Sequence, residues 1–319
     1  MLRAMMVYNP AAGRYPSRLL TERAANVLKN NGWQIRIEET RSGEHITRLA
    51  NQAVQDEMDA FLVVGGDGSL NRALPGLMGS LTALGILPAG TANVWGQEIG
   101  LPGLTWTRIT ALEESARRLA NAQILETDIG LCNGTPFLLW AGIGLDAFIV
   151  HRLEPRSQLE KSFAVVQYAA SAAWNASQWR GMNLSVETDG EQVSGHFLLA
   201  TVSNIHLYAG GYAELSPHAI LDDGFMELWL FEGENIEDTV QIAWNLWSGQ
   251  HLTSERVQSI SFQKAVFRSD SALYIQTDGE PLEGNGEAII EVKPKALRVL
   301  VPEKTPRRLF SQPDEWRKG

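Results

Sequence analysis

Cysteine is almost absent from this 319-residue sequence, in which Cys132 is the single example. A lone cysteine excludes an internal disulfide and any metal site built from a CxxC pair, which favours a reducing compartment such as the cytoplasm. No uninterrupted apolar run approaches the ~18 residues of a membrane-spanning helix, and the first residues turn polar too early for a signal peptide. We therefore expect a cytoplasmic protein without a membrane anchor.

Basic residues are also scarce, because 27 Lys and Arg stand against 37 Asp and Glu, for a formal net charge of −10. This balance argues against general nucleic-acid binding. Two common nucleotide motifs are missing: the sequence has no G-x-x-x-x-G-K-[ST], and residues 65–71 do not spell G-x-G-x-x-G. The 44% hydrophobic content is still enough for a full core and two domains.

Residues 61–71, FLVVGGDGSLN, combine an apolar strand with a glycine turn. The first four residues are apolar, as expected of a strand buried on both faces of a parallel sheet. The glycines that follow let the backbone approach a ligand closely, and Ser69 is a suitable N-cap for a helix over 70–78. Amide N–H groups converge at such a helix N-terminus, so the stretch predicts an anion site.

Asp67 is an unexpected residue in an anion site. A carboxylate among phosphates is repulsive unless a divalent cation lies between them or the carboxylate takes up a proton. Asp67 therefore indicates Mg-nucleotide chemistry. The simpler alternative is a glycine turn in which Asp67 only caps a helix.

The first part of the chain alternates strands with helices. Strands are predicted over 5–8, 33–37, 61–64 and 84–87, with helices over 19–28, 44–54 and 109–122 and another starting at Val94. This alternation predicts a parallel sheet with helices on both faces and a ligand site beyond the carboxyl ends of the strands. Asn9, Thr40 and Asp67 would lie at that edge.

From residue 124 the pattern changes to alternating apolar and polar residues, which predicts a β-sandwich. Asn-Gly and Asp-Gly turns separate several of the predicted strands. The expected domains are therefore 1–123 and 124–302, with the tail 303–319 packed back on the first domain. The predicted elements of the second domain are strands over 137–143, 184–188, 196–202, 225–231, 257–267, 288–292 and 297–301 and helices near 160–179 and 236–248.

Six short motifs occur together in this chain and are similar to those of the diacylglycerol kinase catalytic family, which includes soluble bacterial lipid kinases and sphingosine kinases. Their order along the chain matches the family order. The motifs are NPAAG at 9–13, GGDGS at 65–69, LPAGTAN at 87–93, AGIGLDA at 141–147, LDDG at 221–224 and TDGE at 277–280.

The resemblance implies a kinase that transfers the γ-phosphate of Mg-ATP to the hydroxyl of diacylglycerol or a related lipid. It implies an NAD kinase-like nucleotide-binding domain followed by a β-sandwich, with ATP between them. Hydroxyl and amide side chains suit ribose and phosphate oxygens. The residues that the resemblance assigns to the ATP site are Asn9, Thr40, Gly66, Asp67, Gly68, Ser69, Leu70, Asn71, Thr91 and Asn93.

The resemblance also assigns catalytic roles. Glu280 matches the proton acceptor that would activate the lipid hydroxyl, although without the resemblance it is an ordinary hairpin-turn carboxylate. Asp67 would bind Mg²⁺ through water, whereas in sphingosine kinases the corresponding aspartate is credited as the base. Both assignments remain open at this point.

Two further sites follow from the resemblance. Asp146 corresponds to the carboxylate that meets the lipid headgroup, and its alternative role is an N-cap on the helix from Ala147. Asp223, with the backbone carbonyls of Ile220 and Phe225, corresponds to a structural Mg²⁺ site, because oxygen ligands in a tight turn suit a hard cation. The alternative for Asp223 is an ordinary acidic turn.

Two residues depart from the family pattern: Arg72 replaces a usual Glu, and Val94 replaces a frequent Asp. Fewer carboxylates near the phosphate site would change its charge, its metal affinity or its substrate choice. Two other functions therefore stay open. One is another GGDG-type kinase such as an NAD kinase, and the other is a non-catalytic ATP-binding regulator.

A membrane-resident substrate and a chain without an anchor predict peripheral, transient membrane contact. A basic face near Arg152, Arg156 and Lys161 could orient the protein on anionic lipid. The sequence carries no signal for a particular oligomeric state.

Overall fold

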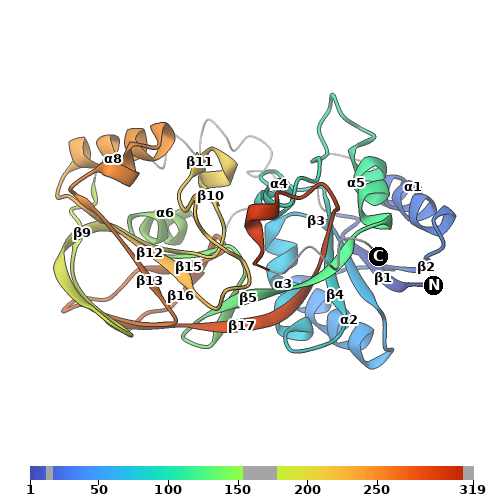
Figure 1. Ribbon diagram of the computed structural model, residues 1–319, viewed down its shortest axis with the longest axis horizontal. Helices are drawn as coiled ribbons and strands as arrows, with labels where there is room; N and C mark the ends of the chain where they lie inside the picture. The colour runs from blue at the N-terminus through green and yellow to red at the C-terminus, as the bar shows by residue number, and fades with distance from the viewer. Residues whose placement is uncertain (12–16, 154–177, 312–319) are drawn as a thin grey trace. The chain divides into compact units, whose positions relative to one another are not determined.

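The computed structural model describes residues 1–11, 17–153 and 178–311. The chain forms two compact units (Figure 1), and their membership alternates along the sequence. The first unit holds residues 1–129, 220–223 and 294–319, and the second holds 130–219 and 224–293. Residues 124–129, 220–223 and 294–302 therefore lie in the first unit, although the domain limits expected from sequence place them in the second.

The first unit contains a parallel sheet. Its strands are β1 (Arg3–Tyr8), β2 (Gln34–Glu39), β3 (Ala60–Gly65) and β4 (Ala83–Pro88), in the order β4-β3-β1-β2. The residues of β3 from Ala60 to Val64 are all buried, as the continuous apolar run predicts for a strand covered on both faces. The carboxyl ends of β1, β3 and β4 therefore point the same way, and their loops share one edge.

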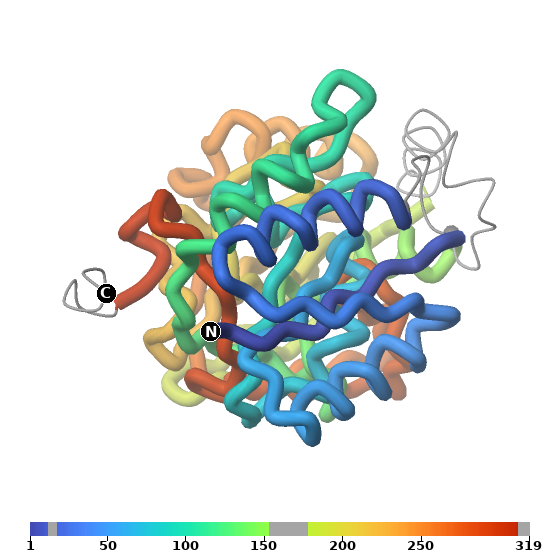
Figure 2. Tube along the Cα trace, turned by 90° about the vertical axis from the view of Figure 1, so that its right-hand side faces the viewer, coloured from blue at the N-terminus to red at the C-terminus, as the bar shows by residue number. Residues whose placement is uncertain are grey.

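Helices cover both faces of this sheet (Figures 1 and 2). α1 (Ser17–Asn30) lies beside α5 (Ala111–Ala120) on one face, and α2 (Gly43–Gln55) lies beside α3 (Asp67–Leu77) on the other. The α2 helix starts where Ser42 caps it, since the Ser42 side chain accepts the N–H of His45. The short helix α4 (Val94–Glu98) follows β4 and begins at the predicted residue.

The second unit is built mainly from antiparallel strands, as the alternating pattern predicts. Its main strand order is β16-β15-β7-β9-β8-β14-β17, and β12 pairs with β9 and β13. β5 and β17 cross the boundary between the units. The strands are β5 (Gln123–Cys132), β6 (Thr135–Phe137), β7 (Trp140–Gly144), β8 (Met182–Thr188), β9 (Gln192–Ser203), β10 (Leu207–Tyr208), β11 (Ala213–Glu214), β12 (Met226–Glu232), β13 (Val257–Phe262), β14 (Lys264–Arg268), β15 (Ile275–Thr277), β16 (Glu280–Leu282) and β17 (Glu287–Val301).

The helical elements of this half of the chain are few. α6 (Leu145–Leu153) follows β7, and α8 (Ile236–Ser248) occupies the predicted range 236–248. Short 3₁₀ turns are η1 (Ala209–Gly211), η2 (Gln250–Thr253) and η3 (Arg307–Leu309). Residues 160–177 of the helix predicted near 160–179 lie outside the described residues.

Two predicted strands are each broken by a carboxylate from elsewhere in the chain. The run 137–143 is split between β6 and β7, because the N–H groups of Leu138, Leu139 and Trp140 bind Asp278 instead of a neighbouring strand. The run 257–267 is split at Gln263, whose N–H binds the Asp189 carboxylate. The prediction of two single strands was wrong, since neither partner is visible in the local sequence.

The opposite error occurs at 288–292 and 297–301, which are parts of one strand, β17. β17 pairs antiparallel with β14 in the second unit and parallel with β4 in the first. Lys295 has a positive φ of 52° inside it, and its N–H binds the carboxylate of Asp128. This local irregularity interrupts the alternating pattern and explains the wrong prediction of two strands.

The described part of the tail packs on the first unit. The Thr305 hydroxyl donates to the carbonyl of Ile99 at 2.8 Å, and the carbonyl of Leu309 accepts the N–H of Leu221. Leu309 and Phe310 are buried. Among the described residues no helix is both long enough and apolar enough to cross a membrane.

Candidate active site

Two glycine loops of the first unit touch through their backbones. Gly66 follows β3 and Gly90 follows β4. A Cβ placed on Gly90 would lie 2.6 Å from the Cα of Gly66, and one on Gly66 would lie 3.1 Å from the Cα of Gly90. A side chain at position 90 would therefore clash with the backbone of Gly66, which explains why glycine occupies this position.

Asn93 closes the second of these loops. Its side-chain oxygen accepts the N–H of Gly90 at 2.8 Å, and its amide donates to the Gly90 carbonyl at 2.9 Å. Its backbone is left-handed, with φ 55° and ψ 48°, a conformation that asparagine tolerates better than most residues. Asn93 is 5% exposed, so in this structure it shapes the loop rather than presenting its amide to solvent.

Asp67 links the two loops. Its carboxylate oxygens accept the N–H groups of Val94 at 2.9 Å and Trp95 at 3.1 Å, so it caps α4 from the neighbouring loop. Burial raises the pKa of Asp67, and hydrogen bonds from backbone amides oppose that rise. The simpler role considered for Asp67, a helix cap, is thus present in the structure, on α4.

The predicted N-cap role of Ser69 is wrong. α3 begins at Asp67 with Gly66 as its N-cap, and Ser69 lies in the first turn, where its N–H bonds to the Gly66 carbonyl. Gly66, in an extended conformation, takes the N-cap position three residues before Ser69, so the helix has already begun when the chain reaches Ser69. The helix N-terminus therefore lies at the glycines themselves.

The remaining predicted ATP residues lie at the same sheet edge. Thr40 is buried, and its hydroxyl donates to the carbonyl of Tyr8 at the end of β1. Asn9 forms a local turn by accepting the N–H of Ala11. Residues 12 and 13 of this loop lie outside the described residues. Gly68 and Thr91 are exposed, Asn71 is half-buried and Leu70 is buried.

The two residues that depart from the family pattern occupy different environments. Val94 is 1% exposed, so a carboxylate there would be buried. Arg72 is an exposed residue of α3, with its side chain against Gly43 and its carbonyl accepting the Thr47 hydroxyl. Val94 thus belongs to the core at α4, and Arg72 contacts the start of α2.

In the second unit Asp146 is the centre of a polar cluster. Its carboxylate accepts the N–H of Ala147 at 2.7 Å, the side-chain amide of Gln276 at 3.0 Å and the hydroxyl of Tyr208 at 3.2 Å. Burial raises the pKa of Asp146 to about 6, against the effect of these donors. The Asp146 carboxyl therefore titrates closer to neutral pH than an ordinary aspartate does.

Two glycines make room for this carboxylate. A Cβ on Gly142 would lie 1.9 Å from Oδ2 of Asp146, so only glycine fits there. Gly144 has φ +98° at the turn from β7 into α6, a conformation that side chains rarely adopt. The GxGxD spacing at 142–146 is therefore explained by one close approach and one backbone turn.

Gln276 connects Asp146 to the turn that carries Glu280. Its amide nitrogen donates to Asp146, and its oxygen accepts the N–H of Gly279 at 2.7 Å. Gln276 is 1% exposed. Asp278 and Gly279 have φ 49° and 84°, as in the hairpin turn that Asp-Gly predicts. Glu280 is the half-buried first residue of β16, so Gln276 links Asp146 to the turn that directly precedes Glu280.

The roles of three residues around Asp146 and the Gly279 turn were not predicted from the sequence. Gln276 lies inside a strand and Tyr208 lies in a two-residue strand, so neither belongs to a motif. Asp278 accepts the N–H groups of Leu138, Leu139 and Trp140 at 2.9–3.1 Å. Asp278 belongs to the TDGE motif and to the Asp-Gly turn, but neither pattern predicts that it binds the backbone between β6 and β7.

The predicted Mg²⁺ ligands stay a prediction. Ile220 and Asp223 belong to the first unit and Phe225 to the second. Asp222 is 2% exposed; one of its oxygens accepts the N–H of Ser311, and the other has no hydrogen-bond partner. Within the described ranges, no three His, Cys, Asp or Glu side chains gather as a metal site.

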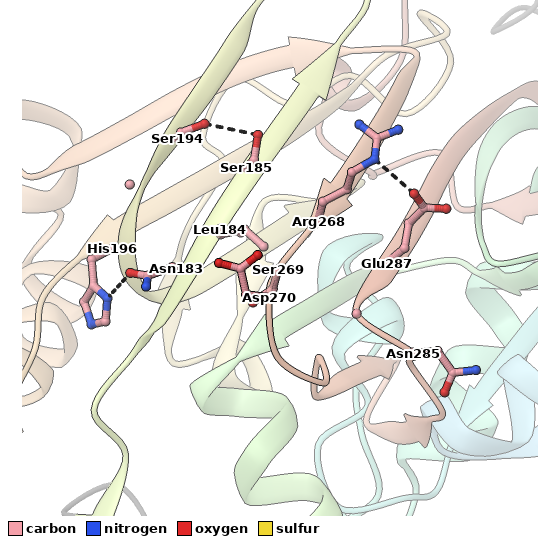
Figure 3. Close-up of a pocket in the computed structure, with 12 residues that line it drawn as sticks. Asn183, Leu184, Ser185, Ser194, His196, Arg268, Ser269, Asp270, Asn285 and Glu287 are labelled. Atoms are coloured by element: carbon pink, nitrogen blue, oxygen red, sulfur yellow. Dashed lines mark hydrogen bonds and ion pairs between the residues drawn. The ribbon is translucent and has the colours of Figure 1, made fainter.

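A pocket of about 830 Å³ on the second unit contains none of the predicted residues (Figure 3). Its polar side chains bind one another: Ser185 pairs with Ser194, Asn183 with His196 and Arg268 with Glu287. In β8 these outward residues alternate with buried Met182, Leu184 and Val186. The pocket is therefore the solvent side of a sheet with a polar and an apolar face, and we do not count it as the active site.

Comparison with known proteins identifies two family models that fit this chain. The diacylglycerol kinase catalytic domain matches residues 3–132. The YegS C-terminal NAD kinase beta sandwich-like domain matches residues 141–301. Together they confirm the predicted fold class, an α/β nucleotide-binding domain followed by a β-sandwich-like domain.

Individual relatives agree with these matches. A diacylglycerol kinase of Bacillus subtilis (strain 168) is 23% identical over 282 residues, covering 88% of this chain and 90% of its own. A diacylglycerol kinase of Staphylococcus aureus (strain MRSA252) is 25% identical over 280 residues, covering 87% and 86%. A crystal structure of a diacylglycerol kinase from Bacillus anthracis str. Sterne shares the fold, with TM-score 0.71 at 18% identity over 96% of this chain and 98% of its own. The chain therefore belongs to the diacylglycerol kinase catalytic family and is a kinase of that family with a YegS-type C-terminal domain.

Proposed function

We propose that this protein transfers the γ-phosphoryl group of Mg-ATP to the hydroxyl of diacylglycerol or a related lipid. The first unit would supply the nucleotide contacts and the second would supply the contacts to the acceptor. The observation that carries this proposal is the hydrogen-bonded chain from Asp146 through Gln276 to the Gly279 turn. It connects a carboxylate suited to a polar headgroup with the turn that carries a potential base, Glu280.

Glu280 is the better candidate for the base. Both oxygens of Asp67 accept backbone N–H groups of α4, so moving or protonating Asp67 would disturb the loop that it caps. Glu280 instead begins a short hairpin strand whose preceding turn is fixed by Gln276 and Asp278. We assign proton removal from the lipid hydroxyl to Glu280 and loop organisation at the phosphates to Asp67.

The residues of the first unit fit a nucleotide. Gly66 leaves the N-terminus of the 11-residue helix α3 free of a Cβ, as phosphates require. Magnesium bound to ATP would neutralise charge on the transferred group. Asp67 keeps lone pairs beyond its two hydrogen bonds and could hold a water of that ion. The predicted roles of Asn9, Thr40, Thr91 and Asn93 are part of the same proposal.

The acceptor is reached by peripheral contact with a bilayer in this proposal. Arg152 is exposed, and its guanidinium carbon lies 4.7 Å from the centre of the Phe148 ring. Arg156 and Lys161 lie outside the described residues. The orienting role of this basic face therefore stays a prediction.

The test is transfer of labelled γ-phosphate from Mg-ATP to an extracted lipid mixture. Wild type should yield a labelled lipid, and Glu280→Gln should not. Glu283→Gln is the matched control, because Glu283 is an exposed carboxylate directly after the same hairpin, and it should retain activity. ATP binding without any labelled lipid would contradict the proposal and favour the non-catalytic regulator. A labelled dinucleotide with NAD as acceptor would favour the NAD kinase alternative.

A further inference from the structure

Helix α8 exposes an apolar stripe on its outer side. Val240, Trp244 and Trp247 recur at helical spacing and are 62%, 53% and 67% exposed. The ring centroids of Trp244 and Trp247 lie 5.2 Å apart. Leu252 in the following turn η2 is also exposed. We call these four residues the α8 face; exposed apolar clusters of this kind usually mark an interaction site.

The inner side of the same helix is firmly anchored in the second unit. Ile242 and Leu246 are buried in an apolar cluster that also contains Leu145 and Tyr208. Leu145 immediately precedes Asp146, and Tyr208 donates to its carboxylate. The α8 face is therefore the outer side of an element whose inner side packs on the core that supports the proposed headgroup site.

The second anchor is His251 of η2. Its ring lies against Trp229, and its Nε2 is 3.0 Å from the carbonyl of Leu215. At the other end of the helix Arg256 forms an ion pair with Asp238. These contacts hold the backbone of α8 and η2 without using any residue of the α8 face.

The charge pattern indicates what the α8 face binds. Residues 239–254 contain no Asp, Glu, Lys or Arg, in a chain with a net charge of −10. No charged group would have to be desolvated when this segment enters an apolar environment. Tryptophan is the residue type that favours the boundary between headgroups and acyl chains, and amphipathic helices lie in this zone with their apolar side inward.

The size of the face argues against a second copy of the chain as its occupant. A tryptophan buries about 150–250 Å² when fully covered, and both indoles here are already partly covered. The two indoles thus offer on the order of 300 Å², and the exposed parts of Val240 and Leu252 add on the order of 100 Å². The sum, about 400 Å², is well below the ~800 Å² per partner of a stable protein interface. A fluid bilayer needs no complementary surface of fixed shape.

We propose that the α8 face docks the protein on the interface of a lipid bilayer, by apolar insertion rather than by attraction to anionic headgroups. The inference rests on the proposed lipid-kinase function, because docking would serve to bring the Asp146 cluster to an acceptor that resides in the membrane. Docking itself requires no catalysis. It should be insensitive to salt, because apolar burial is not screened.

The test is co-sedimentation with zwitterionic phosphatidylcholine vesicles. Replacing both indoles in Trp244→Gln/Trp247→Gln should lower the partition coefficient at least about tenfold, since ~60 Å² of apolar burial already corresponds to about a factor of ten. The matched control is Trp106→Gln/Ile109→Gln, which removes two exposed apolar side chains of the first unit; its binding should stay within about twofold of wild type. Equal thermal unfolding midpoints would show that both variants fold.

Three results would overturn the proposal. Binding that requires anionic lipid and disappears in high salt would assign docking to basic residues. An equal loss in both double variants would show nonspecific adsorption. A wild-type dimer in analytical ultracentrifugation that becomes monomeric only in Trp244→Gln/Trp247→Gln would assign the face to a second copy.

A soluble short-chain diacylglycerol separates docking from catalysis. Activity on it should be similar in wild type and Trp244→Gln/Trp247→Gln, whereas activity on vesicle-borne substrate should fall with binding. If wild type phosphorylates no lipid at all, the proposed function fails, and the vesicle-binding result still decides the docking proposal.

Discussion

Asp67 and Asp146 are two partly buried carboxylates at equivalent local positions, each at a turn from a strand into a helix, yet they have different partners. Asp67 accepts backbone N–H groups of Val94 and Trp95. Asp146 accepts one backbone N–H and two side-chain donors, from Gln276 and Tyr208. The donors to Asp67 are part of the backbone of its unit, so no substitution except proline removes them. The donors from Gln276 and Tyr208 to Asp146 are side chains, which a substitution can replace without changing the fold.

Burial raises the pKa of both carboxyls, and the opposing hydrogen bonds stabilise each charged form. The same local element, a glycine turn ending in an aspartate, therefore binds backbone groups of a neighbouring loop in one unit and side chains of other strands in the second unit.

Glu280→Gln should have the largest effect, because removing a general base lowers turnover by about 10²–10⁴. The apparent affinity for ATP should remain, since Glu280 is not among the proposed ATP contacts. Asp67→Asn should instead raise KM for ATP through the loop that it caps. Steady-state kinetics of the two variants give the comparison. Full turnover in Glu280→Gln with none in Asp67→Asn would reverse the assigned roles.

Gly142→Ala should destabilise the second unit by about 2–3 kcal/mol, because its Cβ would lie 1.9 Å from Asp146 Oδ2. Urea unfolding followed by circular dichroism measures this loss. Gly190→Ala is the control, as no atom lies within 4 Å of the Cβ position there, and it should stay within about 0.5 kcal/mol of wild type. Equal stability of the two variants would show that Asp146 moves aside at little cost.

Asp278→Ala should cost more stability than Asp67→Ala. Asp278 accepts three backbone N–H groups and Asp67 accepts two, and each unsatisfied buried donor costs about 1 kcal/mol or more. We expect losses of about 3 and about 2 kcal/mol in urea unfolding. The reverse order would mean that the loop capped by Asp67 is the more rigid of the two.

The free energy of unfolding should depend on pH differently in wild type and in Asp146→Asn, because asparagine carries no titrating carboxyl. Its pKa rises from an ordinary 3.8 to about 6 on folding, so the folded chain binds more protons at Asp146 than the unfolded chain between these values. Wild type therefore loses stability relative to Asp146→Asn as pH rises from about 4 to about 6, by about 1–2 kcal/mol after allowance for partial exposure.

The measurement is the difference between the urea unfolding free energies of wild type and Asp146→Asn at pH 4, 5 and 6. Taking the difference cancels the other carboxylates, which both proteins share. A difference that does not change with pH would show that Asp146 has the same pKa in the folded and unfolded chains.

Much of the fold was predictable because it depends on local patterns. The apolar run of β3 identified a strand covered on both faces, and the spacing of apolar residues located α8 at its observed bounds. The Asp-Gly pair at 278–279 identified a hairpin turn. The N-cap preference of serine failed as a guide at Ser69, because Gly66 already occupies the N-cap position of α3.

The partners of the site residues could not be predicted in the same way. Asp278 meets Leu138 and Asp146 meets Gln276 across 140 and 130 positions of sequence. Hydrogen bonds at such separations depend on strand pairing, here between β7 and β15. A polar residue within a strand, such as Gln276, carries no local sign of the partner that it will find.

By itself the sequence determined the order of strands and helices, the positions of the glycine turns and the carboxylates that end them, because backbone preferences and apolar periodicity act over a few residues. Only the tertiary structure decided which groups each carboxylate contacts. Val94 and Trp95 reach Asp67, and Gln276 reaches both Asp146 and Gly279, through the pairing of distant segments. Burial and donor type, which set the pKa and the role of a carboxyl, exist only after that pairing.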